Sequence, residues 1–541
     1  MRATNVVTVT DTTPRGVGDR VWIAGLATDT TFNGAYEVTG STPGTSWTYT
    51  STGSNGSPTG TAQVLGDRCI DLELDVDGNS AAFTYLNAGT SHVMLGGNLS
   101  KSSLVIRDSR YNTFGRIFTG YNITDFEIPS GKTSIGINEF IQFDSYCDRV
   151  KIGTLWGENL NDDLLAWGVV NNSGTYQDTA PACGPGNMGT LVVDVLYANN
   201  LAVSPASIMK IYAYTGYDAG IVKIGTVTGL GAVIVGDTQS GAGGGTVTEL
   251  SIDNLTNKPA NNATQIILGG GGAFSNISRF NIGRFLDRPN TATSTGYAMI
   301  VGDPVTTLNV GSFVSTVDRS GAGPYGVVFS ANVTSAKFGS MNTLGGDGSA
   351  ALLANGANVV VDDLQVTNWT HNGANANSLL VYSQNGAYFK NVQITNFSVN
   401  VGKVISTNTS GKTHNWTLVN GRIDGSFAVA SDSTSGTYNV QLVGINAPTL
   451  VNNLVQAYQT GTWRIVGQSI KAPAGQYVLT GQTLTMSINA PDFQVDMGVN
   501  GAGGAITTQL TPLAGDQLFN TNATGGGLYG RTAAGAWTKI F

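Results

Sequence analysis

The sequence predicts an all-β fold, a right-handed parallel β-helix (a solenoid) with a small β module at each end. A short apolar pattern recurs from about residue 150 to residue 446, as in residues 280–285 (Phe-Asn-Ile-Gly-Arg-Phe) and 308–313 (Leu-Asn-Val-Gly-Ser-Phe). It returns every 22 to 41 residues, a period typical of solenoids and other repeat arrays. No amphipathic helix is predicted between the repeats, which disfavours leucine-rich and α-helical solenoids.

Each repeat is predicted to contain two short strands joined by a bend. Its apolar residues stand at positions i, i+2 and i+5, and the first step is the alternation of a strand. The step of three breaks this alternation, so the chain must bend after i+2. Glycine accepts positive φ without steric cost, and aspartate tolerates it better than most residues. The expected bend residues are Gly153, Asp194, Gly225, Asp253, Gly283, Gly311, Gly339 and Asp362.

Aligning the repeats on position i+2 predicts which residues stack in neighbouring coils. The aligned residues are Ile152, Val193, Ile224, Ile252, Ile282, Val310, Phe338, Val361, Phe389, Leu418 and Val440. Successive members are 41, 31, 28, 30, 28, 28, 23, 28, 29 and 22 residues apart. A propeller blade needs four strands in about 40–45 residues, so most of these units are too short for a propeller.

The composition fits a protein with many tight turns and argues against several classes of partner. Of the 541 residues, 73 are glycine, 41% are hydrophobic and 11% are charged, and the formal net charge is −8. This acidic balance disfavours nucleic acid and anionic membranes as partners. We see no apolar run typical of a signal peptide and no stretch of about 20 apolar residues. We therefore expect a protein made and folded in the cytoplasm, without membrane insertion.

Cysteine and glycine usage predicts no metal centre and no other cofactor. The three cysteines, Cys69, Cys147 and Cys183, are odd in number and widely spaced. Their spacing fits neither a metal site nor a disulfide framework. The glycine-rich stretches at 241–245 and 269–272 lack the Lys-Ser/Thr that a phosphate-binding loop requires.

Changes of pattern divide the chain into five regions. Residues 1–66 are a separate β module with alternating strands and Asn-Gly and Pro-Gly turns. Residues 67–149 are interpreted as the first coils and cap of the β-helix, because a solenoid needs its first coil covered. Residues 150–446 are the regular β-helix, residues 447–470 a connector and residues 471–541 a C-terminal β tip.

Both ends of the chain resemble parts of bacteriophage proteins. Residues 17–25 (Val-Gly-Asp-Arg-Val-Trp-Ile-Ala-Gly) and 32–39 (Phe-Asn-Gly-Ala-Tyr-Glu-Val-Thr) resemble a module of phage tail and fibre proteins. Residues 515–530 resemble the tip of tailspike-like and pectate-lyase-like virion proteins. With the β-helix between them, the whole chain resembles a phage tailspike. The resemblance implies a homotrimer on the virion tail, a trimerisation role for the C-terminal tip, and contacts with other tail proteins and a host-surface polysaccharide.

The most carboxylate-rich stretch, residues 156–167, lies in the longest repeat. That repeat has 41 residues, so its excess must form loops, and loops on a rigid scaffold often carry function. Glycosidic cleavage needs two carboxyl groups, about 5–5.5 Å apart for retention or 6.5–9.5 Å for inversion. Adjacent residues of a strand point to opposite faces, so a partner one coil earlier is expected; Glu139, Asp144 and Asp148 stand there. The candidate catalytic residues are Glu139, Glu158, Asp162 and Asp163, with Glu139–Asp162 or Glu158–Asp162 as the pair.

Asn161-Asp162-Asp163 also resembles the Asp-Asp element of polygalacturonase-like β-helix hydrolases. This resemblance implies hydrolysis rather than lyase chemistry. The chain departs from that family in lacking its Gly-His-Gly element, because His371 and His414 each stand in Thr-His-Asn. The alternative interpretation is a polar turn or an Asn/Asp stack without a catalytic role.

Aromatic residues near the acidic stretch are candidates for glycan binding. The apolar faces of sugar rings stack on aromatic side chains, and carboxylates bind sugar hydroxyls. The candidates are Trp156, Trp167, Tyr212, Tyr214, Tyr217 and Asp218. The alternative is that these aromatic residues pack in the core or between protomers.

Two functions of different classes therefore stay open. The first is a virion tailspike that binds and depolymerises a host-surface polysaccharide. The second is a non-catalytic receptor-binding or structural fibre with the same fold, because a fold does not determine activity.

Overall fold

The computed structural model shows a protein built almost entirely of β-strands, and the residues it describes include no α-helix. The described residues are 1–12, 15–24, 26, 28–59, 63–66, 71–76, 91–99, 102–110, 116–135, 139–158, 163–169, 186–199, 208–230, 234–237, 244–258, 266–268, 273–287, 297–315, 326–345, 350–373, 379–400, 402–424, 427–431, 436–448, 455–457, 462–468, 478–479, 483–489, 517–520, 527–531 and 537–539. The chain forms an N-terminal unit, residues 1–260 and 265–280, and a C-terminal unit, residues 261–264 and 281–541.

The N-terminal unit begins with a module of two small antiparallel sheets. The first sheet contains β1 (Arg2–Ala3), β2 (Val6–Thr10), β6 (Ser46–Thr50) and β5 (Gly40–Thr42). The second contains β4 (Gly34–Glu37), β3 (Arg20–Ala24) and β7 (Gln63–Gly66), and a single 3-10 turn, η1 (Thr30–Phe32), precedes β4.

A buried arginine, Arg2, holds the strands and loops of this module together through hydrogen bonds. Arg2 is only 1% exposed, and its guanidinium lies 4.1 Å from the centre of the Phe32 ring. It donates hydrogen bonds to the backbone oxygens of residues 52 and 54 and to the side chains of Thr31 and Asp29. These acceptors offset the cost of burying a charge, so Arg2 joins the first strand to two loops.

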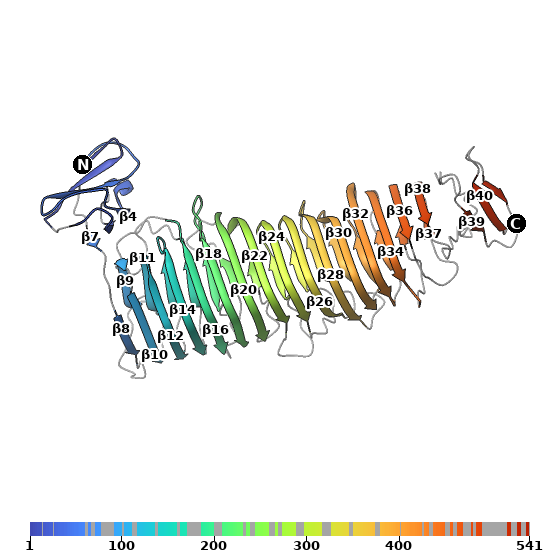
Figure 1. Cartoon of the computed structure of the whole chain (residues 1–541), viewed down its shortest axis with the longest axis horizontal. Helices are drawn as coiled ribbons and strands as arrows, with labels where there is room; N and C mark the ends of the chain where they lie inside the picture. The colour runs from blue at the N-terminus through green and yellow to red at the C-terminus, as the bar shows by residue number, and fades with distance from the viewer. Residues whose placement is uncertain are drawn as a thin grey trace. The chain divides into compact units, whose positions relative to one another are not determined.

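The rest of the N-terminal unit consists of coils in which a long strand alternates with a short one, and the long strands stack in parallel (Figure 1). The long strands are β8 (Asp71–Val76), β10 (Ser102–Arg110), β12 (Phe126–Ile135), β14 (Arg149–Glu158), β16 (Thr190–Asn199), β18 (Ile221–Leu230) and β20 (Gly245–Lys258). The short strands are β9 (Ser91–Leu99), β11 (Arg116–Ile123), β13 (Glu139–Asp144), β15 (Asp163–Gly168), β17 (Met209–Tyr212), β19 (Ile234–Asp237) and β21 (Ile266–Leu268). β22 (Phe274–Asp287) contains the boundary between the units.

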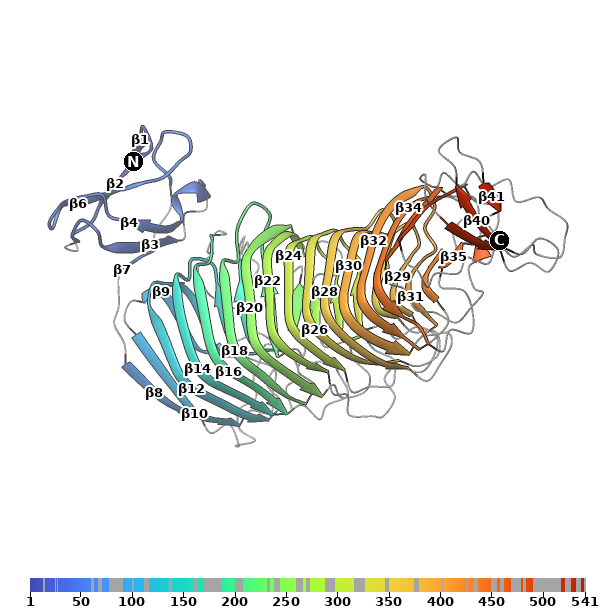
Figure 2. The ribbon, with the colours of Figure 1, turned by 45° about the vertical axis from the view of Figure 1, so that its right-hand side comes forward.

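The C-terminal unit has the same alternation, and its long strands curve along their length (Figure 2). The long strands are β24 (Val305–Ser315), β26 (Val333–Gly345), β28 (Val360–Gly373), β30 (Tyr388–Asn400), β32 (Lys412–Ile423), β34 (Gly436–Asn446), β36 (Thr462–Gln468) and β38 (Thr483–Asn489). The short strands are β23 (Met299–Val301), β25 (Val327–Phe329), β27 (Ala350–Asn355), β29 (Leu379–Gln384), β31 (Lys403–Thr407), β33 (Phe427–Ser431), β35 (Val455–Ala457) and β37 (Val478–Leu479). A small antiparallel sheet of β39 (Gln517–Asn520), β40 (Gly527–Arg531) and β41 (Trp537–Lys539) follows.

The predicted fold class is confirmed: a parallel β-solenoid spans residues 126–446, with small antiparallel sheets at the N-terminus. The long strands β24, β26, β28 and β30 carry four inward positions, one more than predicted. In β24 these are Val305, Leu308, Val310 and Phe313, all buried. The additional position lies three residues before i.

This fourth position explains an error in the predicted alignment. Phe338 pairs with Val366, and Val366 pairs with Ile394. The predicted partners Val361 and Phe389 are therefore wrong by five residues, since they occupy the additional buried position of their strands. Val440 is wrong by two residues, because Leu418 pairs with Leu442.

Glycine at the bends serves a different purpose from the predicted one. Gly153 and Gly311 do not adopt positive φ. A Cβ on Gly153 would lie 2.1 Å from the backbone oxygen of Pro129, and one on Gly311 would lie 2.5 Å from that of residue 283. The close approach of the neighbouring coil therefore excludes a side chain. Positive φ occurs one residue further along, at Asn396 (54°) and Asn420 (52°).

Candidate functional site

Two of the predicted catalytic carboxylates begin neighbouring strands. Glu139 opens β13 and Asp163 opens β15, and the two residues are register partners, which places their backbones about 4.8 Å apart. The expected partner of Glu139 was Asp162, one residue earlier, and it lies outside the described residues together with Asn161. The structure describes the backbone of Glu139 but not its side chain.

Asp163 is a buried counter-ion rather than an exposed acid. Its side chain is 0% exposed, and its Oδ2 lies 2.6 Å from Nζ of Lys210, which is 13% exposed. Lys210 comes from β17, the next short strand. A buried charge is stable only when it is paired, so Asp163 and Lys210 hold β15 and β17 together.

A second buried polar network lies on the same strands. Gln142 Nε2 donates to Asp144 Oδ1 at 2.8 Å and contacts the Tyr212 hydroxyl at 3.1 Å. The Tyr212 hydroxyl donates to the same Asp144 oxygen. Asp144 was among the carboxylates considered from the sequence, whereas Gln142 and Lys210 were not predicted. Gln142 could have been recognised as a polar residue between two apolar residues of β13.

This network lies on the outer face of the short-strand sheet. The Phe143 ring contacts Phe126 of β12 and Trp167 of β15, so Phe143 points toward the long-strand sheet. Gln142 and Asp144, its neighbours, must then point the opposite way. Both are nevertheless buried, so this outer face is covered.

An exposed aromatic stack lies on the long-strand sheet. Trp156 of β14 and Tyr197 of β16 are register partners, and their ring centres are 3.9 Å apart with the planes at 31°. Trp156 is 37% exposed, and its Nε1 donates to Glu158 Oε1 at 2.8 Å. We call Trp156, Tyr197 and Glu158 the aromatic platform. Tyr197 was missed in the sequence, although it stands four residues after Val193, as Trp156 does after Ile152.

The other aromatic candidates are less accessible. Trp167 and Tyr212 are buried, and Trp167 Nε1 donates to the backbone oxygen of Ala219 at 2.8 Å. The structure therefore places both in packed interior positions, where a sugar ring cannot stack on them. Tyr214 and Tyr217 are half-buried and flank a tight turn, with ring centres 6.3 Å apart.

Asp218 makes hydrogen bonds that connect neighbouring coils. Its carboxylate accepts hydrogen bonds from the backbone N–H groups of Gly220 and Thr248 and from the Thr248 hydroxyl. Its own N–H donates to Asn187 Oδ1. Asp218 thus ties three neighbouring coils together.

The triplet Arg149-Val150-Lys151 contains two cations that lie near carboxylates one coil earlier. Lys151 pairs with Glu127 at 3.0 Å, and Arg149 lies 3.7 Å from Asp125. Both cations stand at the start of β14, and Glu158 ends the same strand. The triplet therefore does not contribute to the aromatic platform.

Both histidines of the C-terminal unit are interior groups. Burial lowers the pKa of His371 to about 4. Burial also lowers the pKa of His414 to about 4, against the opposing effect of its contact with the Phe389 backbone oxygen. His414 stacks on Tyr438 with ring centres 5.1 Å apart, so it forms part of the core.

The described residues include no cluster of metal-ligating side chains. Among them, Cys147 is buried and its thiol donates to the Asp144 backbone oxygen at 3.1 Å, and Cys69 and Cys183 lie outside the described residues. No helix among the residues described is long and apolar enough to cross a membrane.

No family model, curated protein or solved structure matches the chain.

Proposed function

We propose that this chain is a tailspike-like virion protein whose β-helix binds a host-surface polysaccharide through the aromatic platform. The observation that carries the proposal is the exposed stack of Trp156 on Tyr197, with Glu158 bonded to the indole nitrogen.

The platform has the features that glycan recognition requires. Trp156 and Tyr197 offer a flat apolar surface to the C–H face of a sugar ring. The stack and the hydrogen bond to Glu158 fix the indole before binding, so little conformational entropy remains to be lost. Within the described part of the chain, Glu158 Oε2 has no donor from the protein, so it is available to a sugar hydroxyl.

The virion setting rests on the two ends of the chain. Residues 17–25 and 32–39 resemble a phage tail module, and β3 (Arg20–Ala24) and β4 (Gly34–Glu37), which carry most of these stretches, pair in one antiparallel sheet. Residues 515–530 resemble a tailspike tip, and their region contains the small sheet of β39, β40 and β41. A homotrimer with other tail proteins as neighbours belongs to the same proposal.

Cleavage of the bound polysaccharide is the second candidate. Glu158 places a carboxylate directly beside the aromatic stack, where a glycosidic bond would lie. We favour Glu139 or Asp162 as the partner carboxyl over Asp163, which is buried and paired with Lys210. If neither residue serves, the protein is a non-catalytic receptor-binding fibre.

Binding is tested with the full chain and a panel of purified capsular and O-antigen polysaccharides. For the polysaccharide that binds, Trp156→Ala and Tyr197→Ala should each weaken binding at least about tenfold, since a desolvated aromatic anchor carries about 2 kcal/mol or more. Tyr388→Ala, which removes a half-buried aromatic ring from β30 of the C-terminal unit, is the matched control. Unchanged affinity of Trp156→Ala would show that the platform is not the site.

Cleavage is tested by following the mass of the bound polysaccharide. A fall in polymer mass that stops in Glu158→Gln would support the enzymatic role. Binding without any fall in mass would leave the fibre role. Full activity of a variant carrying Glu158→Gln, Glu139→Gln and Asp162→Asn together would rule out the predicted catalytic residues.

A further inference from the structure

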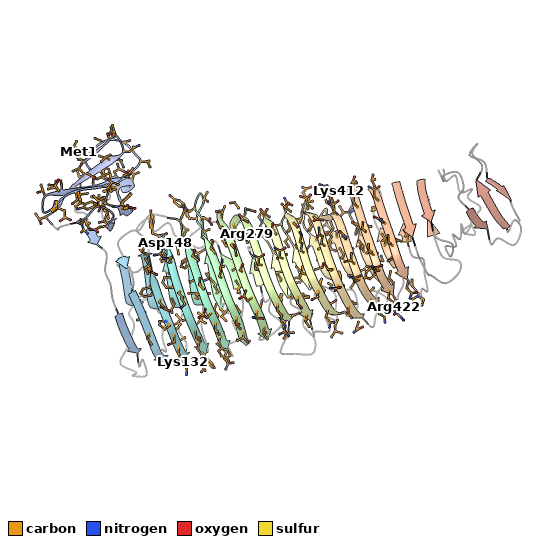
Figure 3. All side chains as sticks on the ribbon, in the orientation of Figure 1. Met1, Lys132, Asp148, Arg279, Lys412 and Arg422 are labelled. Carbon is orange, nitrogen blue, oxygen red and sulfur yellow. The ribbon has the colours of Figure 1, made fainter. Side chains whose placement is uncertain are left out.

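One lysine stands directly beside the aromatic platform. Lys132 of β12 is the register partner of Trp156, one coil earlier, at a backbone separation of about 4.8 Å. In-register partners of a parallel sheet project to the same face, so Lys132 and Trp156 share the outer face. Figure 3 labels Lys132 near the lower ends of the first long strands.

Lys132 differs from Lys151 and Arg279, two other cations of the long strands, which pair with carboxylates. Lys151 pairs with Glu127 at 3.0 Å, and Arg279 pairs with Glu249 at 3.0 Å. Among the described residues, no carboxylate lies within ion-pair distance of Lys132. Lys132 is half-buried, and its ammonium is available to a ligand anion.

We propose that Lys132 makes the aromatic platform selective for an acidic sugar, a uronic acid or another residue that carries a carboxylate. This inference rests on the proposed binding of a polysaccharide. The ring of the acidic sugar stacks on Trp156, and its carboxylate accepts a charge-assisted hydrogen bond from Lys132 Nζ.

The positions of the two charges orient the sugar. Lys132 lies one coil from Trp156, across the sheet, whereas Glu158 lies two residues along the strand, at about 6.6 Å. A stacked ring therefore has a cation at one edge and an anion at another. The carboxylate of the ligand is attracted to Lys132 and repelled by Glu158, which leaves Glu158 to accept hydroxyl hydrogens.

The column beyond the platform carries no further charge. Tyr197 pairs with Thr228, and Thr228 pairs with Thr256. From Lys132 to Thr256 the column spans four coil spacings, about 19 Å. The carboxylate of the ligand is therefore recognised at the Lys132 end of the column. Neutral sugar hydroxyls fit the remaining positions up to Thr256.

The test compares acidic polymers with neutral forms of the same polymers. The full chain is titrated with hyaluronan, alginate, polygalacturonate and bacterial capsular uronic-acid polymers, each before and after chemical reduction of its carboxyl groups to alcohols. We expect tighter binding of the unreduced form by about fivefold, the contribution of a partly exposed ion pair. The preference should shrink with added salt.

Lys132→Gln should abolish the preference for the acidic form while keeping the binding of the reduced form. Lys223→Gln is the matched control, because Lys223 is an exposed lysine of β18 that is not in register with the platform. Equal binding of acidic and reduced polymers, or equal effects of the two substitutions, would overturn the inference.

The outcomes separate this inference from the proposed function. Polymers that bind equally before and after reduction, and lose binding in Trp156→Ala, would leave the proposed glycan binding intact and remove the role of Lys132. A complete lack of binding to acidic and neutral polymers would remove both.

Discussion

The early coils of the N-terminal unit and the coils of the C-terminal unit share one strand pattern but differ on their outer faces. The partners Ile152, Val193 and Ile224 are 41 and 31 residues apart. The partners from Val310 to Leu442 are 28, 28, 28, 24 and 24 residues apart. The irregular coils carry the aromatic platform, and the regular coils carry ladders of one residue type.

The ladders show what regular spacing permits. Asn391, Asn415 and Asn439 stand in register, and each amide donates to the preceding one at 2.8 Å. Asn368, Asn396 and Asn420 form a second column with longer contacts of 3.4 and 3.5 Å. Equal coils bring like residues together, and their mutual hydrogen bonds leave few groups for a ligand. Unequal coils bring unlike residues together, and these can form a site.

The buried ion pair should give the largest effect on stability. Lys210→Met leaves the Asp163 carboxylate buried without its partner, which costs about 3–5 kcal/mol. The matched control is Lys390→Met in the regular coils, where Lys390 and Asp362 are 48% and 45% exposed and the expected loss is below about 1 kcal/mol. Hydrogen exchange of β15 and β30 measures the two local losses. Equal losses would contradict the contrast between the two regions.

Acid should weaken the regular coils through their buried histidines. Burial lowers the pKa of His371 and His414 to about 4, from an ordinary value of 6.5. The unfolded chain therefore takes up protons first, so stability is full above pH 6.5 and falls as the pH drops toward 4. At pH 5 the expected loss is about 2 kcal/mol per histidine.

Thermal unfolding at pH 7 and pH 5 measures this loss. His414→Phe keeps an aromatic ring against Tyr438 and removes one titrating group, so the difference between the two pH values should shrink. An unchanged difference would show that His414 is not responsible.

Breaking one asparagine ladder should have a smaller effect. Asn415→Ala removes two amide hydrogen bonds and leaves two partners unsatisfied at a half-buried site, with an expected loss of about 1–2 kcal/mol. Asn342→Ala is the control, because Asn342 is exposed and its side chain makes no hydrogen bond to the described residues. Chemical denaturation compares the two variants, and equal midpoints would contradict a stabilising role of the ladder.

The aromatic platform should give the smallest effect on stability. Trp156→Ala removes a ring that is 37% exposed together with its stack on Tyr197, so the free energy of unfolding should fall by about 0.5–1.5 kcal/mol. The same variant is expected to lose glycan binding. A large loss of stability would indicate that Trp156 is a structural residue, and the contrast between site and scaffold would fail.

The sequence predicts the fold better than the site, for a physical reason. Inward apolar residues recur with the coils, and this periodicity is visible in the sequence. The periodicity misplaces Val361 because both Val361 and Val366 of β28 fit the apolar pattern. Only the observed strand pairing shows that Val366 is the partner of Phe338. Asp163 and Trp167 look accessible in sequence because they flank a loop, yet both are buried: Asp163 pairs with Lys210, and Trp167 packs on the inward-facing Phe143. Pattern alone cannot show which outward face is covered.

The clamp formed by Arg2 has a consequence for the order in which the protein can fold during synthesis. Its backbone acceptor at residue 54 lies 52 residues further along the chain. The first strand therefore cannot reach its final contacts until this segment has left the ribosome, and the module must close as one unit. The coils that follow can add to a preceding coil one at a time, as in other solenoids.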